Sequence, residues 1–289
     1  MKIAVAVIHG IGQSRENFHA ELANNLCAQM AIVNPSVKLY VEGIYWGDIV
    51  NRLEERLWSR IRGKPLRWAK WMRLRPFFVN QLGEAIAYQA VPRDNDPSPD
   101  DYIYDEIHRR FAVCLQRLSD LAGQDAPLCI ISHSLGSIIS SNFFHDLQCN
   151  KLTPKVSEVI GASESRLVHG KTLTHFYTLG SPLAVWALRF KDFGVPIAVP
   201  APPLQGLGIG EWVNFYDTDD VIAYPIKPLN ERYKKVVTAD IEVECPGLLS
   251  WTPLSHRRYF QTQAVIDRIV HSLSTLQVYY EEEEEEARP

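Results

Sequence analysis

Long hydrophobic runs and paired cysteines are both missing from this sequence. No apolar run approaches the ~20 residues that a membrane-spanning helix needs. The apolar run at the start, Met1–Ile8, is too short for the apolar core of a signal peptide. The cysteines are scattered, odd in number and without a C-x-x-C pair: Cys27, Cys114, Cys129, Cys149 and Cys245. This usage favours a reducing compartment without a structural zinc site, so we expect a cytoplasmic protein.

The body of the chain also lacks an excess of charge of either sign. The formal net charge is −4, but Glu281–Glu286 alone supply six negative charges, so the rest is close to neutral. A near-neutral body has no broad basic field, which argues against a nucleic-acid partner. The acidic tail, residues 281–289, is expected to be disordered.

Length and composition are those of an ordinary globular protein. The chain has 289 residues, of which 46% are hydrophobic and 22% charged. This length allows one large core and favours one domain with an insertion over two domains. We therefore expect a single domain over residues 1–280.

Apolar runs of strand length alternate with helical patterns along the chain. Strands are expected at Ile3–Ile8, at Val37–Trp46, from Leu128, at Leu173–Leu179 and at Trp212–Tyr216. Helices are expected at about residues 16–32, 101–121, 134–147 and 261–280, with a polar, mobile loop up to about Lys171. This alternation predicts an α/β fold with a mostly parallel sheet flanked by helices.

The segment between the second and third expected strands is too long for a simple crossover. Residues 48–100 contain helical patterns broken by prolines, for example Ile49, Leu53, Leu57 and Ile61 at helical spacing. We interpret them as a helical insertion, resembling a lid, on the edge or top of the sheet.

The stretch Ser132-His133-Ser134-Leu135-Gly136 joins an apolar strand pattern to an apolar helix pattern. It is similar to the G-x-S-x-G nucleophile elbow, a turn so tight that the residues two before and two after the serine must be small. Ser132 replaces the usual first glycine. Such a turn exposes the Ser134 hydroxyl and directs the Leu135 N–H at an oxyanion. A strand and helix that merely contain serines is the plain alternative.

A second glycine-rich turn, His9-Gly10-Ile11-Gly12, follows the first expected strand. Glycine turns between a strand and a helix also bind phosphate, but the spacing here matches neither the P-loop nor the dinucleotide fingerprint. An oxyanion loop explains the glycines better, because backbone N–H groups must approach the reacting carbonyl closely.

A serine nucleophile needs a base and an orienting acid, which follow it along the chain in the order acid, then histidine. Only His256 and His271 come late enough, and His271 falls on the polar side of the last helix pattern. His256 is therefore the candidate base. The acid candidates cluster at the end of the fifth strand: Asp217, Asp219 and Asp220.

Together these stretches, with Thr178–Pro182, Tyr216–Val221 and Ser255–Tyr259, resemble bacterial lipase/esterase-type members of the α/β-hydrolase superfamily. The resemblance covers most of the strand-forming chain but not residues 48–100. It implies Ser134 as nucleophile, His256 as base, and an oxyanion hole at Gly10, Ile11 and Leu135. It favours Asp220 over Asp217 as the acid. The first strand already bears the oxyanion loop, so the two usual leading strands are missing.

The implied reaction is hydrolysis of a carboxylic ester, a small molecule or a lipid, through an acyl-enzyme without metal or cofactor. The sequence leaves two alternatives open. An acyltransferase or thioesterase would use the same three residues. A non-catalytic protein that binds a lipid or another ligand on this fold would need a defective set.

Residues 52–75 are rich in basic and aromatic side chains. The segment contains two acidic residues and nine basic ones, which are Arg52, Arg56, Arg60, Arg62, Lys64, Arg67, Lys70, Arg73 and Arg75. Trp58, Trp68 and Trp71 lie between them. Basic helices with tryptophan are typical of proteins at anionic membrane surfaces, so peripheral membrane association is one interpretation. An arginine-rich lid whose tryptophans pack on the core is the other.

Overall fold

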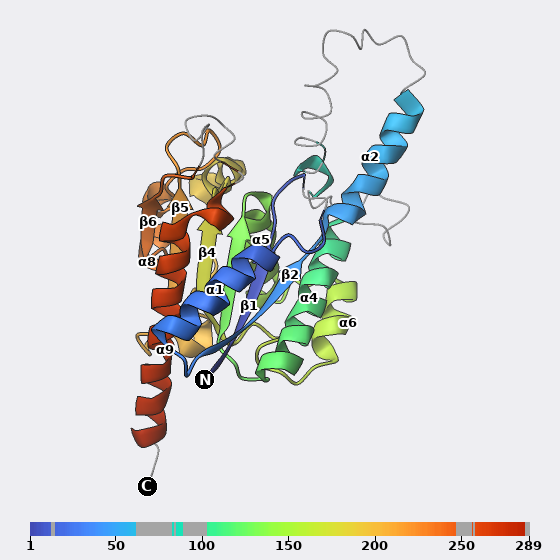
Figure 1. Ribbon diagram of the computed structural model, residues 1–289. Coiled ribbons are helices and arrows are strands. Elements are labelled where there is room, and N and C mark those ends of the chain that lie inside the picture. The colour runs from blue at the N-terminus through green and yellow to red at the C-terminus, as the bar shows by residue number, and fades with distance from the viewer. Residues whose placement is uncertain are drawn as a thin grey trace.

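The computed structural model describes residues 1–12, 15–61, 83, 85–88, 103–246, 256 and 258–286. They contain a 6-stranded sheet in the order β2-β1-β3-β4-β5-β6, in which every pairing is parallel. The strands are β1 (Lys2–Ile8), β2 (Lys38–Ile44), β3 (Leu128–His133), β4 (Leu173–Leu179), β5 (Glu211–Tyr216) and β6 (Ala239–Glu242). The predicted parallel sheet flanked by helices is confirmed (Figure 1).

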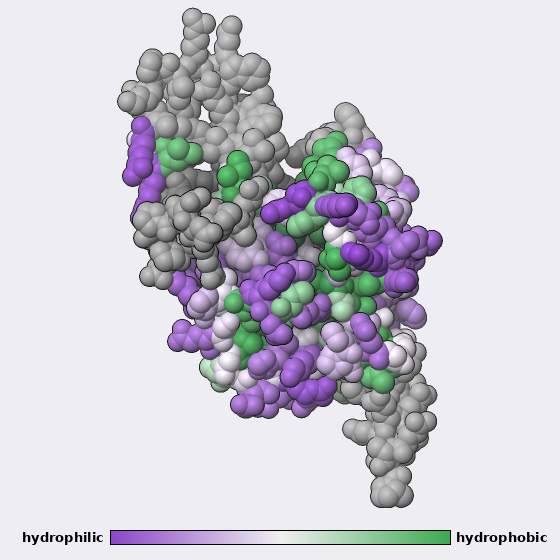
Figure 2. Space-filling model, turned by 180° about the vertical axis from the view of Figure 1, so that it is seen from behind, coloured by the Kyte–Doolittle hydropathy of each residue, from purple (hydrophilic) through white to green (hydrophobic). Residues whose placement is uncertain are grey.

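Helices lie on both faces of the sheet. They are α1 (Ala20–Val33), α2 (Gly47–Ile61), α4 (Ile103–Ala122), α5 (Leu135–Gln148), α6 (Pro154–Gly161), α7 (Leu183–Trp186), α8 (Glu231–Val236) and α9 (Gln263–Glu286). Short 3-10 helices occupy Ala187–Arg189, Lys191–Phe193, Pro202–Leu204, Lys227–Leu229 and Tyr259–Gln261. Helices α1 and α9 pack together on one face, and α4 and α5 cover the other (Figure 1). Figure 2 shows the molecule from behind, with hydrophobic side chains among many hydrophilic ones.

The sequence of β1 explains why the molecule has two cores. Successive side chains of a strand point to opposite faces of a sheet. Ala4, Ala6 and Ile8 therefore enter the core beneath α4 and α5. Ile3, Val5 and Val7 enter the core beneath α1 and α9. Because both faces are covered, β1 reads as a continuous apolar run rather than an alternating one.

Sequence reasoning missed several elements, among them α6 and β6. The expectation of a mobile loop up to Lys171 is wrong, because this segment contains α6. Helix α6 begins with Pro154, and proline is favourable at the first position of a helix. Val156 and Ile160 of α6 are buried, and Gln116 of α4 donates to the Val159 carbonyl. Strand β6 was also missed, because its four residues, three half-buried and one exposed, carry little apolar pattern.

Two helix boundaries also differ from expectation. Helix α1 begins at Ala20 rather than near Glu16, because the preceding residues form turns and the Phe18 ring packs edge-on against His9 with centroids 4.8 Å apart. Helix α9 continues to Glu286, so the tail expected to be disordered is helical to that residue. No glycine or proline interrupts Gln263–Glu286, which removes the usual cause of a helix end.

The described part of the insertion is small. Helix α2 confirms a helix at its start, and residues 85–88 lie near its end, with the Tyr88 side chain fully buried. The other predictions for residues 48–100, including most of the basic segment 52–75, fall outside the described residues. No helix in the described parts of the chain is long and apolar enough to cross a bilayer.

Candidate active site

Ser134 sits in a backbone conformation that side chains rarely allow. Its φ is 53° and its ψ is −128°. Strand β3 ends one residue before it and α5 begins one residue after it, while its N–H donates to the Leu179 carbonyl of β4 at 3.0 Å. Surrounding structure must hold such a strained residue in place, and strain of this kind clusters at functional sites. The geometry is that of a nucleophile elbow.

Two glycines let the turn after β1 approach the turn at Ser134. A Cβ on Gly136 would lie 2.6 Å from the His9 carbonyl oxygen. A Cβ on Gly10 would lie 2.4 Å from the Cβ of Ser134. Real Cβ atoms do not approach that closely, so both positions require glycine. The first glycine turn therefore lies directly against the serine, as the sequence predicts.

Ser132 shows how the elbow tolerates its departure from glycine. The residue is fully buried, and its Oγ donates to the Tyr177 carbonyl at 3.0 Å. The neighbouring strand thus satisfies the extra hydroxyl. Serine fits here because it is small and finds an acceptor.

The His256 ring connects Ser134 to Asp220. Its Nε2 lies 2.7 Å from the Ser134 Oγ, and its Nδ1 lies 2.7 Å from the Asp220 Oδ2. An ionised carboxylate only accepts hydrogen bonds, so Nδ1 carries the proton and Nε2 is free to accept from the serine hydroxyl. The His256 side chain is 16% exposed and the Asp220 side chain 1%. The structure thus brings together the three residues that the sequence singled out.

Asp217, the second choice for the acid, is occupied elsewhere. Its Oδ1 accepts from the Asp219 N–H and its Oδ2 from the Cys245 N–H, both at 2.9 Å. These bonds fold the loop after β5 and join it to the chain beyond β6. Asp220 is the aspartate that contacts His256.

Tyr259 is a site residue to which the sequence analysis gave no role. Its hydroxyl donates to the Asp220 Oδ2 at 3.0 Å and accepts from the Asp217 N–H at 2.8 Å. Its ring lies over Gly180, where a Cβ would come within 2.6 Å of the ring. Burial raises the pKa of Tyr259, so the hydroxyl remains a donor. The Gly180 turn and Tyr259 together orient the carboxylate.

His9 fixes the peptide that precedes Ile11. The Trp46 N–H donates to the His9 Nε2 at 3.1 Å, so the proton is on Nδ1, which donates to the Gly10 carbonyl at 2.6 Å. Burial lowers the pKa of His9 to about 4, and the ring stacks on Trp46 with centroids 4.9 Å apart. In a trans peptide the N–H points opposite to the carbonyl. The Ile11 N–H therefore points away from the His9 ring.

The backbone at the start of α5 supplies the other expected oxyanion donor. Leu135 is the first residue of α5, and first-turn N–H groups have no partner within a helix. The Ser134 carbonyl is held by the Ser137 Oγ at 2.6 Å, and the Ser137 Oγ lies 2.6 Å from the Ser181 Oγ. These bonds tie the elbow to the turn after β4.

His133 is a second residue that sequence reasoning passed over. Its Nε2 lies 2.5 Å from the His256 carbonyl oxygen, and the centroids of the two rings are 4.8 Å apart. Burial, followed by the nearby His256, lowers the pKa of His133 to about 3. The ring therefore stays neutral at ordinary pH and donates to that carbonyl. It holds the backbone of His256 without adding a second positive charge.

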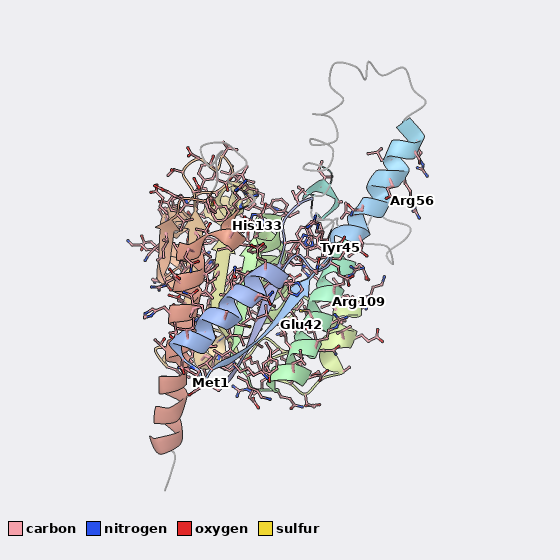
Figure 3. The ribbon with its side chains drawn as sticks, in the orientation of Figure 1. Met1, Glu42, Tyr45, Arg56, Arg109 and His133 are labelled. Carbon is pink, nitrogen blue, oxygen red and sulfur yellow. The ribbon has the colours of Figure 1, made fainter. Side chains whose placement is uncertain are left out.

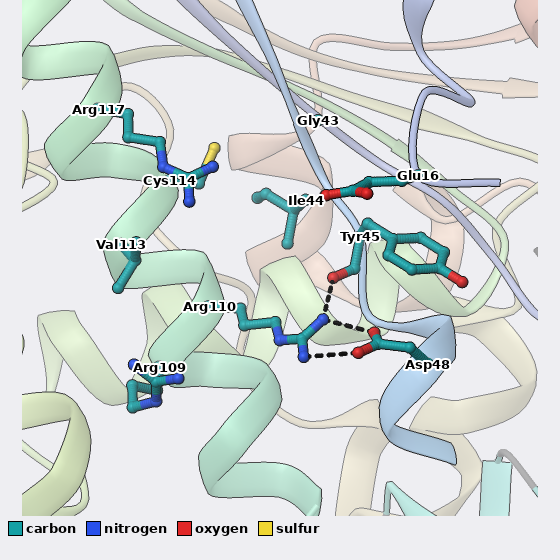
Figure 4. A pocket seen from close by; sticks show the side chains of 10 residues that line it. All are labelled: Glu16, Gly43, Ile44, Tyr45, Asp48, Arg109, Arg110, Val113, Cys114 and Arg117. Atoms are coloured by element: carbon teal, nitrogen blue, oxygen red, sulfur yellow. Dashed lines mark hydrogen bonds and ion pairs between the residues drawn. The ribbon is translucent and has the colours of Figure 1, made fainter. Parts of the chain in front are cut away.

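A polar pocket of about 540 Å³ lies between α4 and the end of β2 (Figure 4). Arg110 donates to the Tyr45 carbonyl at 2.9 Å and pairs with Asp48. Arg109 pairs with Glu106 at 2.9 Å. The contacts of Arg110 join α4 to the chain after β2, whereas the Arg109 pair lies within α4. In the described residues, no group of three or more His, Cys, Asp or Glu side chains is placed to hold a metal ion.

The strand order and the position of Ser134 decide the fold. Ser134 stands at the carboxyl end of a central parallel strand, on a strand–turn–helix unit beside a glycine loop from β1. The chain has the α/β-hydrolase fold. In that fold the oxyanion loop follows the third strand, whereas here it follows β1, so the two leading strands are absent from the described sheet.

Known proteins offer only distant likenesses. No family model matches the chain, and no curated protein matches it. Among solved structures, a Pyrobaculum calidifontis esterase is 10% identical with a TM-score of 0.43, over 96% of this chain and 77% of that one. For a structure of Rhizomucor miehei fungal esterases, the identity is 14% and the TM-score 0.39, over 96% of this chain and 76% of that one. For an acetyl xylan esterase, the identity is 9% and the TM-score 0.34, over 93% of this chain and 98% of that one. Likenesses with TM-scores below 0.5 give no basis for assigning an activity. The function therefore has to be inferred from this chain's own residues.

Proposed function

We propose that this protein hydrolyses carboxylic esters through an acyl-enzyme on Ser134. The observation that carries the proposal is the His256 ring, which lies within 2.7 Å of both the Ser134 Oγ and the Asp220 carboxylate. A hydroxyl, an imidazole and a buried carboxylate in this line form an activated nucleophile. Strain at Ser134 supports the same role, because the backbone conformation presents the hydroxyl to the ring.

In the first half of the reaction, the His256 Nε2 takes the Ser134 proton while Oγ bonds to the ester carbonyl carbon. The carbonyl oxygen becomes an oxyanion, for which the Leu135 and Ile11 N–H groups are the donors. When the tetrahedral intermediate collapses, the carbon–oxygen bond to the alcohol breaks, and the alcohol oxygen receives the proton from His256. Ser134 is left acylated.

In the second half, water replaces the alcohol. The His256 Nε2 takes a proton from water, whose oxygen bonds to the acyl carbon. Collapse breaks the bond to the Ser134 Oγ, which recovers its proton from His256, and a carboxylic acid leaves. Asp220 accepts from the His256 Nδ1–H throughout and stabilises the imidazolium in both halves.

The test is turnover of p-nitrophenyl acetate and butyrate by the native chain and by Ser134→Ala. We expect release of p-nitrophenol by the native chain and a loss on the order of 10⁴-fold or more in the variant. Ser157→Ala, at an exposed serine of α6, is the matched control and should leave turnover unchanged. A Ser134→Ala variant as active as this control would refute the assignment.

The same assay tells hydrolysis from acyl transfer. An added alcohol or thiol that captures the acyl group would lower the yield of free acid without lowering p-nitrophenol release. A hydrolase gives free acid as the main product even when the acceptor is present. Main-product acyl transfer would make the protein an acyltransferase with the same three residues.

We also propose that the basic segment, residues 52–75, contacts anionic membranes. Helix α2 extends away from the sheet, and its side chains Arg56, Leu57 and Arg60 are exposed (Figure 3). Each basic residue near an anionic surface contributes about 1 kcal/mol, screened by salt. Binding to phosphatidylglycerol vesicles should exceed binding to phosphatidylcholine vesicles, and the triple change Arg52, Arg56 and Arg60 to Gln should remove the difference. Equal sedimentation with both vesicle types would contradict this proposal.

A further inference from the structure

One peptide group belongs both to the polar pocket beside α4 and to the support of the turn after β1. Tyr45 and Trp46 join the end of β2 to the start of α2. On the pocket side, the Tyr45 carbonyl accepts from Arg110 of α4 at 2.9 Å (Figure 4). On the other side, the Trp46 N–H donates to the His9 Nε2 at 3.1 Å. Because a peptide group is planar and rigid, Arg110 and the His9 ring hold opposite sides of one unit.

The Arg110 guanidinium is fixed at both ends of its side chain. Asp48, in the first turn of α2, accepts from its Nη1 at 2.5 Å and from its Nη2 at 2.8 Å. This two-point contact sets the plane of the guanidinium, from which Nη1 also reaches the Tyr45 carbonyl. Next to Arg110 on α4, the side chains of Ile107 and Phe111 are fully buried in the core and hold this part of the helix. The donor to the Tyr45 carbonyl therefore belongs to a group with little freedom to move.

Trp46 holds His9 by three contacts. Besides the backbone bond to Nε2, the Trp46 indole N–H donates to the His9 carbonyl at 3.1 Å. The two rings also stack, with an angle of 8° between their planes. Both side chains are buried. The His9 ring therefore follows a displacement of the Tyr45–Trp46 peptide.

From His9 the contacts continue to the Ile11 N–H. The His9 Nδ1 donates to the Gly10 carbonyl at 2.6 Å, and this carbonyl shares a peptide group with the Ile11 N–H. Three hydrogen bonds in series thus connect the Arg110 guanidinium with the Gly10–Ile11 peptide. The Ile11 N–H is one of the two donors that the proposed mechanism uses for the oxyanion.

Arg109, the neighbour of Arg110, lines the same pocket without joining this series. Its guanidinium pairs with Glu106 of the same helix at 2.9 Å, and among the described residues it donates to no other element. The Arg109 side chain is 42% exposed, against 30% for Arg110. The two arginines therefore share a helix, a pocket and a charge, and they differ in the contact with Tyr45.

We propose that Arg110 is a positioning residue for the oxyanion hole, acting from the pocket between α4 and β2. Its donation to the Tyr45 carbonyl fixes the Tyr45–Trp46 peptide, this peptide fixes His9, and His9 fixes the direction of the Ile11 N–H. A donor that is held in place before the reaction stabilises the developing charge without having to reorient. The effect on catalysis rests on the proposed function, whereas the effect on the turn after β1 does not.

The first measurement follows the turn after β1 by NMR in the full chain carrying Arg110→Gln. Hydrogen exchange of the Trp46 N–H should be about tenfold faster than in the native chain, because its peptide has lost the donor on the carbonyl side. The Ile11 amide resonance should shift. Arg109→Gln is the matched control and should leave both the exchange and the resonance as in the native chain.

The second measurement compares turnover with the binding of a transition-state analogue. Removing an oxyanion donor outright lowers kcat by about 10²–10³-fold, so a donor that is only less well held should cost about tenfold. In Arg110→Gln, kcat for p-nitrophenyl butyrate should fall about tenfold, with KM close to the native value. Arg109→Gln should leave kcat unchanged.

Propyl trifluoromethyl ketone is the analogue. The Ser134 Oγ bonds to its carbonyl carbon, the serine proton passes to His256, and the ketone oxygen becomes the oxyanion. Because affinity for such an analogue follows affinity for the transition state, its Ki should rise about tenfold in Arg110→Gln. A variant that is merely unstable has fewer folded molecules and therefore a lower kcat with an unchanged Ki.

The outcomes separate this proposal from the proposed function. Faster Trp46 exchange together with the changes in kcat and Ki, in Arg110→Gln and not in Arg109→Gln, supports the positioning role. Native exchange in Arg110→Gln, or native kcat and Ki despite faster exchange, overturns it even when the native chain hydrolyses esters. A native chain without turnover refutes the proposed function and the catalytic part of this proposal, while Trp46 exchange still shows whether Arg110 holds the turn.

Unfolding midpoints show whether each variant is folded. Arg110→Lys keeps the charge beside Asp48 but loses the planar fork of the guanidinium. It takes the place of Arg110→Gln when that variant does not fold, with an expected rise in Ki of about threefold. An unchanged Ki in folded Arg110→Lys would then overturn the proposal.

Discussion

Histidine, aspartate and a hydroxyl group meet at two places in this molecule. At the carboxyl edge of the sheet, His256 lies 2.7 Å from both the Ser134 Oγ and the Asp220 carboxylate. Between α4 and α5, the His108 Nε2 lies 2.9 Å from the Tyr88 hydroxyl. Its Nδ1 is 3.9 Å from the Asp146 carboxylate, too far for a hydrogen bond. Similar residue types thus form two clusters with different geometry.

The His108 cluster is closed off from water. Its side chain is 1% exposed, and the Tyr104 ring lies 4.0 Å from it. Burial lowers the pKa of His108 to about 3 and raises that of Tyr88, so neither group changes charge at ordinary pH. Asn142 donates to the Tyr88 hydroxyl, which directs the tyrosine proton to His108. A site for proton transfer needs an acid, a base and a hydroxyl in line, and access for a substrate. Of the two clusters, only the one around His256 has both hydrogen bonds and a partly exposed histidine.

The largest expected contrast is between the two histidines. His256→Ala should lower kcat/KM for a p-nitrophenyl ester by about 10⁴-fold or more, because the members of such a set act as a unit. His108→Ala should keep kcat/KM but lower the free energy of unfolding by about 2–4 kcal/mol, since it leaves a cavity and removes the acceptor of the Tyr88 O–H. Urea titrations and initial rates on both variants measure this. Comparable losses of activity in the two variants would end the distinction.

The carboxylates give the next contrast. Asp220→Asn should leave the fold intact and lower kcat about 10⁴-fold, because an amide holds His256 in the wrong tautomer. Asp217→Asn should act mainly on stability, since its carboxylate accepts backbone N–H groups. Steady-state kinetics and thermal unfolding separate the two effects. The reverse pattern would move the acid three residues upstream.

A smaller contrast is expected between two tyrosines. Tyr259→Phe removes a donor to Asp220 and should lower kcat about tenfold, which is about 1.4 kcal/mol. It should also move the acidic limb of the kcat/KM profile to higher pH, because a less shielded Asp220 favours protonated His256. Tyr88→Phe should change neither quantity. A purely structural role for Tyr259 predicts an unmoved pH profile.

The last prediction concerns the pH dependence of stability. Burial lowers the pKa of four histidines: His9 to about 4, His108 to about 3, His133 to about 3 and His175 to about 4. In the unfolded chain each of these histidines has a pKa of about 6.5. As the pH falls from 6.5 toward the lowered values, the unfolded chain therefore binds protons that the folded chain does not bind. Above pH 6.5 these histidines should therefore leave the free energy of unfolding unchanged. Below pH 6.5 it should decrease by up to about 1.4 kcal/mol per pH unit for each histidine.

His108→Gln isolates one such histidine. Between pH 6 and 4.5, the slope of the free energy of unfolding against pH should be smaller in this variant than in the native chain. The difference should reach at most the contribution of one bound proton, about 1.4 kcal/mol per pH unit. His271→Gln, at an exposed residue of α9, is the matched control and should keep the native slope. Equal slopes in the native chain and in His108→Gln would show that His108 titrates normally in the fold.

Sequence reasoning succeeded where a local pattern has one physical cause. Strand β1 is apolar throughout because both its faces are covered, and Ser134 is marked by the small residues that a tight turn demands. His256 followed from chain order and from the polar position of His271. The four residues of β6, none of which is fully buried, carried no comparable pattern.

The rest of the site depends on contacts that leave no local signature. Asp217 and Asp220 differ only in the partners of their carboxylates, which lie on distant segments. Tyr259 orients Asp220 across the space left by Gly180, and His133 contacts the backbone carbonyl of His256. The residues alone left Asp217, Asp219 and Asp220 open as the acid, and only the family resemblance favoured Asp220.

The most direct test of the account is reaction of the native chain with a fluorophosphonate probe, followed by intact mass and peptide mapping. Only a serine activated by a neighbouring base reacts quickly with such a probe. We predict one adduct, on Ser134, lost in His256→Ala and retained in His108→Ala. No adduct on the folded native chain, or an adduct on Ser134 that persists in His256→Ala, would contradict the assignment of His256 as its base.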